Sequence, residues 1–186
     1  MNRRTFITLL ASAAASYPLS ALTERRLQQL PAPKLKDPWK TIAAVQEHLF
    51  PADEHSPGAQ DIQALNFLQS MITAPDVEDS ERKHITNGAG WLNDLSIQVY
   101  KHKFIELDEN NREKILRKIE QSRAGSRWLS LLMSYLIEAL LSDPIYGGNK
   151  NSAGWKWLEH QPGFPTPTSD KKYFKLGHIV NRRTKA

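Results

Sequence analysis

The chain has 186 residues, of which 40% are hydrophobic, so it is long enough for one domain of ordinary size plus a leader and tails. Its formal net charge is +5, but 20 acidic residues are interspersed with 25 basic ones, a pattern that argues against nucleic acid as the partner. The absence of cysteine excludes disulfides, thiolate ligation of an iron–sulfur cluster and attachment of c-type haem by this chain.

Residues 1–21 have the layout of a cleavable export signal. A positive head with Arg3 and Arg4 precedes an apolar run and then small residues, and the run is too short to span a bilayer. The adjacent arginines followed by Phe6 resemble the twin-arginine pattern, which is read by a translocase that moves folded proteins. We therefore expect export to the periplasm by that route, and loss of the two arginines with the signal would leave a net charge of +3.

The leader departs from the usual twin-arginine pattern in several places. Asn2 occupies a position where Ser or Thr is usual, Thr8 one where Lys is common, and Leu19 one where a small residue normally precedes a cut after Ala21. The alternative is an amphipathic N-terminal helix of a cytoplasmic protein, but residues 11–16 carry no charged face for such a helix.

Residues 22–37 contain two prolines and no clean period, so they predict an extended linker before a helical domain over residues 38–165. Asp37 as N-cap and Pro38 at the first helical position predict the first helix, which Phe50 and Pro51 would end. Its core positions follow at helical spacing: Ile42, Val45 and Leu49.

After a polar loop over residues 52–59, two more helices are expected from their apolar faces. The second helix would bury Ile62, Leu65, Phe67, Leu68, Met71 and Ile72. The third would contain Trp91, Leu92, Leu95, Val99 and Tyr100. Gly88 and Gly90 just before that stretch predict that the third helix starts with a turn.

The last two expected helices differ in character. Asp108 is the candidate cap of a charged surface helix with a narrow apolar stripe. The stretch 127–141 has its polar residues four apart on one face and is apolar elsewhere, so it is predicted to be the core helix rather than a membrane span of roughly 20 residues. No strand pattern persists in the domain, so the predicted fold is all-α, with about five helices around one apolar core helix.

Two segments carry a family resemblance. The first contains Pro51, Asp53, Pro57, Gly58 and Ala59. The second, directly after the core helix, contains Asp143, Pro144, Tyr146, Gly147, Gly148, Asn149, Gly154 and Trp155. With these motifs in this order, and a proline-rich close over residues 161–165, the chain resembles the gluconate 2-dehydrogenase subunit 3 family.

The resemblance implies a small subunit without catalysis of its own, which assists the export and folding of a flavoprotein. The implied partner is a flavin-containing large subunit of the glucose-methanol-choline oxidoreductase type, often alongside a multihaem cytochrome c subunit. FAD and haem c would then be held by the partners and none by this chain. The mature chain, without a transmembrane helix, would lie in the periplasm, with any attachment to the inner membrane made through its partners.

The residues of the two segments are the candidate partner-binding residues. Paired glycines permit positive φ and close approach of another chain, an asparagine can cap a turn, and aromatic rings anchor interfaces. The candidates are Tyr146, Gly147, Gly148, Asn149, Gly154, Trp155, Trp157, Pro51, Asp53, Pro57 and Gly58. The alternative is that the glycines only terminate the core helix and the tryptophans fold back onto it.

No catalytic, cofactor-binding or metal-binding residue is assigned. The sequence lacks the Gly-x-Gly-x-x-Gly spacing of a dinucleotide site. His48, Asp53, Glu54 and His55 lie close in sequence, but charged loop residues are usually solvated and no metal spacing is present.

The last segment, residues 166–186, is a basic tail with interleaved aromatic residues. Its composition fits RNA, an anionic membrane or an acidic partner surface. The alternative function for the whole chain is a free-standing exported helical protein that binds a sugar acid near Tyr146 and Asn149.

Overall fold

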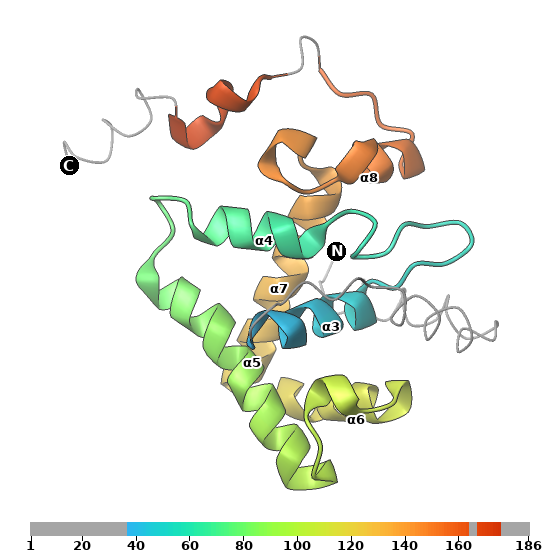
Figure 1. Cartoon of the computed structure of the whole chain (residues 1–186), viewed down its shortest axis with the longest axis vertical. Helices are drawn as coiled ribbons and strands as arrows, with labels where there is room; N and C mark the ends of the chain where they lie inside the picture. Colours follow the sequence, from blue (N-terminus) through green and yellow to red (C-terminus); the bar gives the residue numbers. More distant parts are fainter. Residues whose placement is uncertain (1–36, 164–166, 176–186) are drawn as a thin grey trace. The chain divides into compact units, whose positions relative to one another are not determined.

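A computed structural model describes residues 37–163 and 167–175. In these ranges the chain has six α-helices and no strand (Figure 1), which confirms the all-α prediction. The α-helices are α3 (Trp39–Leu49), α4 (Ala64–Ile72), α5 (Asp79–Tyr100), α6 (Glu109–Glu120), α7 (Arg123–Leu141) and α8 (Ala153–Trp157). Short 3-10 turns are η1 (Phe104–Glu106), η2 (Pro144–Tyr146), η3 (Lys150–Ser152), η4 (Ser169–Lys171) and η5 (Tyr173–Lys175). The expected export signal, with Arg3, Arg4 and Phe6, lies outside the described residues.

Helix α7 is the core helix, as predicted. It packs against α3, α4, α5, α6 and α8, and α3 and α4 cross in front of it in Figure 1. The helix begins at Arg123, earlier than the apolar run alone indicates, because the Ser122 hydroxyl accepts a hydrogen bond from the Gly125 N–H at 3.0 Å and caps it. Its buried side chains include Trp128, Leu132, Tyr135, Leu136 and Ala139, while Ser130 and Glu138 lie on the exposed side.

The prediction that α5 starts with a glycine turn is wrong. Gly88 and Gly90 lie inside α5, which begins at Asp79. A Cβ atom at position 88 would collide with the indole ring of Trp128, whereas one at position 90 would meet nothing within 4 Å. Gly88 therefore permits the close approach of α5 to α7, and the fully buried Trp128 is held there by donating from Nε1 to the Ile85 carbonyl at 2.9 Å.

The predicted cap of the first helix is also wrong in detail. Helix α3 begins at Trp39, and no side chain caps it. The Asp37 carboxylate instead accepts from the Thr41 hydroxyl at 3.2 Å and from Lys103 Nζ at 2.9 Å. The hydrogen bond from Lys103 is the main reason that the pKa of Asp37 lies below its ordinary value. Asp37 thus ties the start of α3 to the segment after α5.

Helix α6 has the predicted cap and the predicted apolar stripe. The Asp108 carboxylate accepts from the Asn111 N–H at 2.8 Å, and the stripe residues Ile115, Leu116 and Ile119 are buried. The helix is joined to α3 by a hydrogen bond, which His48 Nε2 donates to Glu113 Oε2 at 2.8 Å. Desolvation acts to raise the pKa of Glu113, but hydrogen bonds from His48 and Arg117 outweigh it and lower that pKa below its ordinary value.

The turn between α4 and α5 is closed by one arginine. The Arg82 guanidinium donates to the carbonyl oxygens of Ile72, Ala74 and Val77, the last two at 2.9 and 2.7 Å. These carbonyls include the end of α4, where a positive charge is favoured by the helix dipole. Arg82 therefore fixes how α4 leads into α5.

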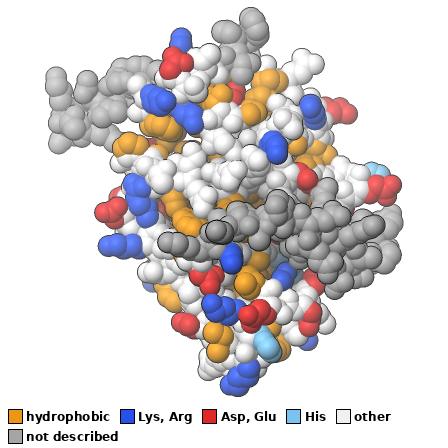
Figure 2. Space-filling view, viewed as in Figure 1, with side chains coloured by type: hydrophobic (Ala, Val, Ile, Leu, Met, Phe, Trp, Pro, Cys, Tyr) orange, Lys and Arg blue, Asp and Glu red, His pale blue; other side chains and the backbone are white. Residues whose placement is uncertain are grey.

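Charges of both signs are mixed over the molecular face drawn in Figure 2. Lys and Arg side chains alternate there with Asp and Glu, and hydrophobic side chains reach the surface between them. This arrangement follows the interspersed charges of the sequence.

Candidate partner-binding surface

The segment after α7 begins with a tight turn. Asp143 precedes η2, and its Oδ1 accepts from the Ile145 N–H at 2.9 Å, while Gly147 follows the end of η2. Gly147 has φ +94°, a value in the region that favours glycine. The two residues together reverse the chain at the end of the core helix.

Asn149 links Ser142, at the end of α7, to Gly154, near the start of α8, through two hydrogen bonds. Its side chain is 0% exposed and its backbone is left-handed, with φ 44°. The amide nitrogen Nδ2 donates to the Ser142 carbonyl at 2.9 Å, and Oδ1 accepts from the Gly154 N–H at 2.8 Å. Asn149 therefore connects the end of α7 to the start of α8.

Helix α8 folds back against the end of α7. A Cβ atom at Gly154 would collide with the Leu140 carbonyl, so only glycine allows this approach. Trp155 is 7% exposed and donates from Nε1 to the Leu141 carbonyl at 2.8 Å. The earlier Gly148 is also buried, close to Ala139 and Phe67. These residues serve the chain's own packing. Trp155 folds back onto α7, as the alternative interpretation expects, but the paired glycines do not terminate the core helix, which ends at Leu141.

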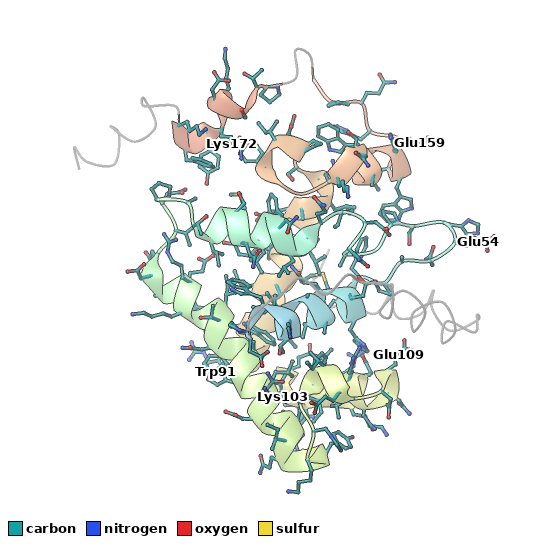
Figure 3. All side chains as sticks on the ribbon, in the orientation of Figure 1. Glu54, Trp91, Lys103, Glu109, Glu159 and Lys172 are labelled. Atoms are coloured by element: carbon teal, nitrogen blue, oxygen red, sulfur yellow. The ribbon has the colours of Figure 1, made fainter. Side chains whose placement is uncertain are left out.

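The earlier motif segment is a closed loop between α3 and α4. The Asp53 carboxylate accepts from the backbone N–H groups of His55 and Ser56, both at 2.7 Å, and the bond from His55 is the main cause that lowers the pKa of Asp53. The Ala59 N–H donates to the Phe50 carbonyl at 2.8 Å and closes the base of the loop. Glu54 marks the outer tip of this loop in Figure 3.

The remaining motif residues of that loop sit nearer its base. Gly58 is buried, and its N–H donates to Asp61 Oδ2 at 2.9 Å, while Pro51 and Pro57 are half-buried. The loop is thus held by its own hydrogen bonds, and its exposed charged residues lie away from the core.

Two aromatic residues that adjoin the motif segments, Phe50 and Trp157, contact each other. The rings of Phe50 and Trp157 lie edge to face, with their centroids 6.3 Å apart. Trp157 is 40% exposed and the adjacent Leu158 is 44% exposed, whereas Phe50 is half-buried. We call the group formed by Phe50, Trp157 and Leu158 the Trp157 surface. It combines the aromatic and aliphatic exposure that interface anchors require.

Tyr146 is covered by the chain's own C-terminal segment. The Tyr173 N–H donates to the Tyr146 hydroxyl at 3.2 Å, and the two rings have centroids 6.1 Å apart. Lys172, labelled in Figure 3, places its Nζ 5.8 Å from the centroid of the Tyr146 ring. The Tyr146 side chain, which belongs to η2, is thus in contact with residues 172 and 173 of the tail.

The sequence model of gluconate 2-dehydrogenase subunit 3 matches residues 36–163, which is more than half of the chain. The chain belongs to the gluconate 2-dehydrogenase subunit 3 family. The resemblance drawn from the two motif segments is thereby confirmed, and the family name indicates a subunit of a dehydrogenase complex. No curated protein and no solved structure matches the chain.

In this subunit 3 chain, the match spans α3 to α8 and both motif segments, and it ends before Tyr173. Of the candidate partner-binding residues, Trp157 and Asp53 are exposed, and Tyr146, Gly147, Pro51 and Pro57 are half-buried. The others, Gly58, Gly148, Asn149, Gly154 and Trp155, are buried within the chain. Contact with a partner stays a prediction for all of them.

The structure adds two residues to the candidate surface of the subunit 3 chain. Phe50 and Leu158 flank Trp157, and neither was among the candidates from the sequence. Phe50 precedes Pro51 and was interpreted only as a helix end. The short helix α8 was also not expected. Its five residues include a glycine and are too few to show a helical period of apolar residues.

Within residues 37–163 and 167–175, no three side chains of His, Asp and Glu are grouped so that they could hold a metal ion. In the same ranges, none of the helices combines the length and the apolar character needed to cross a membrane.

Proposed function

We propose that the chain is the non-catalytic small subunit of a periplasmic or membrane-associated FAD-dependent sugar or sugar-acid dehydrogenase. It binds the flavin-containing large subunit, assists its folding and assembly, and directs the pair to the twin-arginine translocase through Arg3 and Arg4. The observation that carries this proposal is the family match over residues 36–163, which contains the whole Trp157 surface.

The geometry of the Trp157 surface supports a binding role. Trp157 and Leu158 expose large apolar side chains to water, and an aromatic side chain that becomes buried at the centre of an interface supplies much of its binding energy. Phe50 supports the Trp157 ring edge to face, so the ring is already oriented before a partner arrives.

The buried motif residues contribute by holding this surface rigid. Asn149 fixes the start of α8, Trp155 fixes its position on α7, and the loop with Asp53 holds the chain after Phe50. A surface held in its binding geometry loses less conformational entropy on association than a mobile one. The buried motif residues therefore contribute to partner binding indirectly, because they fix the positions of Phe50 and Trp157.

The electron-transfer groups belong to the partners in this proposal. FAD is held by the large subunit, and haem c is held by a cytochrome subunit where one is present. Covalent attachment of haem c requires cysteines, which this chain lacks. The chain contributes binding and export alone.

Export of the partner tests the proposal. The proposed flavoprotein partner is coexpressed with wild-type chain or with Arg3→Lys/Arg4→Lys, and FAD-containing protein is measured in the periplasm and the cytoplasm. We expect the double variant to leave the flavoprotein in the cytoplasm. Normal amounts of periplasmic flavoprotein with that variant would contradict the proposed role in export. Tight binding of a sugar acid by the purified chain alone would favour the free-standing alternative.

A further inference from the structure

Tyr173 of the C-terminal segment contacts an acidic and an aromatic side chain of the helical domain. The Tyr173 hydroxyl donates to Asp76 Oδ2 at 3.2 Å and lies 3.4 Å from Asp76 Oδ1. Its backbone N–H donates to the Tyr146 hydroxyl at 3.2 Å. Residues from the α4–α5 turn and from η2 thus hold the same tyrosine from two sides.

The charge of Glu138, on α7, also acts on the same tyrosine. Burial raises the pKa of Tyr173, and Asp76, Tyr146 and Glu138 raise it further. Glu138 also lies near Glu81, which accepts a hydrogen bond from Tyr135 at 2.7 Å. The surroundings of Tyr173 are therefore rich in carboxylates.

The segment that carries Tyr173 is basic. Lys172 sits over the rings of Tyr146 and Phe174, at 5.8 and 5.9 Å from their centroids. Lys171 and Lys175 flank it and are exposed. A cation over an aromatic ring and lysines beside carboxylates are both favourable, so segment and surroundings are complementary in charge.

We propose that Asp76 and Tyr146 form a notch that recognises a basic segment centred on a tyrosine, and that residues 172–174 of the same chain fill it as a releasable clasp over Tyr146. The notch lies wholly inside the family match, whereas the clasp lies outside it. This inference concerns the chain alone and does not depend on the dehydrogenase role.

The attachment of the clasp is weak enough to open. Among the described residues, its hydrogen bonds and ring contacts to the helical domain come from Lys172 and Tyr173, at distances of 3.2 Å or more. The described residues that connect it to α8 are exposed. A short connection gives an effective concentration on the order of millimolar, so a segment of modest affinity still fills the notch in cis.

A peptide added in trans tests the clasp. A fluorescent synthetic peptide with the sequence of residues 168–178 is titrated, up to several millimolar, into full-length wild-type chain and into the full-length variants Tyr173→Ala and Tyr173→Phe. We expect Tyr173→Ala to bind the peptide at least about tenfold more tightly than wild type, because its own segment no longer competes. Tyr173→Phe should lie between them, since it keeps the ring and loses the bond to Asp76.

Two controls make the result specific. The same peptide with Ala in place of its tyrosine should not bind Tyr173→Ala, and Asp76→Asn combined with Tyr173→Ala should bind the original peptide more weakly than Tyr173→Ala. Equal thermal unfolding midpoints of the variants would show that the helical domain is intact. Absence of binding to every form, or equal affinity for wild type and Tyr173→Ala, would overturn the proposal.

Discussion

Gly88 of α5 lies directly against the indole ring of Trp128 in α7, in a place where no Cβ atom fits. We expect Gly88→Ala to lower the free energy of unfolding by about 3 kcal/mol, because either the helices separate or the fully buried indole moves. Urea denaturation measures this change directly.

Gly90, two residues later in the same helix, is the matched control. It is exposed and a Cβ atom there meets nothing within 4 Å, so Gly90→Ala should raise the free energy of unfolding by about 0.5 to 1 kcal/mol. A Gly88→Ala protein as stable as Gly90→Ala would show that α5 and α7 do not approach as described.

Asn149→Ala should lower the free energy of unfolding by about 2 to 3 kcal/mol. The change removes the bonds to the Ser142 carbonyl and the Gly154 N–H, and it places alanine in a left-handed conformation. Asn151→Ala is the control, because Asn151 has φ 55° but an exposed side chain, so only the backbone effect of about 1 kcal/mol is expected. Equal losses in the two variants would contradict a fastening role for the Asn149 side chain.

Arg82→Met should destabilise the chain by about 2 kcal/mol. It keeps an unbranched apolar stem but leaves the carbonyl oxygens of Ile72, Ala74 and Val77 without their donor. Lys83→Met, at the exposed next position, should stay within about 0.5 kcal/mol of wild type. Chemical denaturation of the two variants side by side gives the comparison, and similar values would argue against the closing role of Arg82.

The contact of Glu113 in α6 with His48 in α3 predicts a pH dependence. The pKa of Glu113 is below its ordinary value in the folded chain, so its contribution is present above the unfolded value, near 4.5, and is lost as the pH falls through the folded value. Wild type should exceed Glu113→Gln in stability at pH 7 by less than about 1 kcal/mol, since the carboxylate is partly exposed. The difference should shrink toward zero as the pH falls below 4.5, and a difference that grows in that acidic range would have the wrong sign.

The helices could be predicted where apolar residues recur at helical spacing or where a capping residue precedes them. Ile42 and Val45 are fully buried at the expected spacing, and Asp108 caps α6 as expected. Gly88 was misread because the sequence shows the missing Cβ but not the indole that occupies its place. Asp37 was misread because the lysine that draws its carboxylate away from the helix start is Lys103, which follows α5.

The candidate surface was predictable only in part. The motif segments could be found from their residues, but the side of the chain that each residue faces depends on long-range packing. Asn149 and Trp155 are residue types that often occur in binding sites. Here both side chains instead donate hydrogen bonds to backbone carbonyls near the end of α7. The contact of Phe50 with Trp157 depends on how α8 returns to the α3–α4 loop, which no local pattern contains.

The most direct measurement is retention of the flavoprotein by affinity-tagged chain with a single exposed tryptophan replaced. Trp157→Ala removes the centre of the Trp157 surface, and Trp91→Ala on α5 removes a tryptophan of similar exposure, 37% against 40%. We expect Trp157→Ala to weaken binding by about 2 kcal/mol, or roughly 30-fold, and Trp91→Ala to leave it unchanged. Equal retention of the flavoprotein by wild type, Trp157→Ala and Trp91→Ala would contradict the assignment of this surface to the partner.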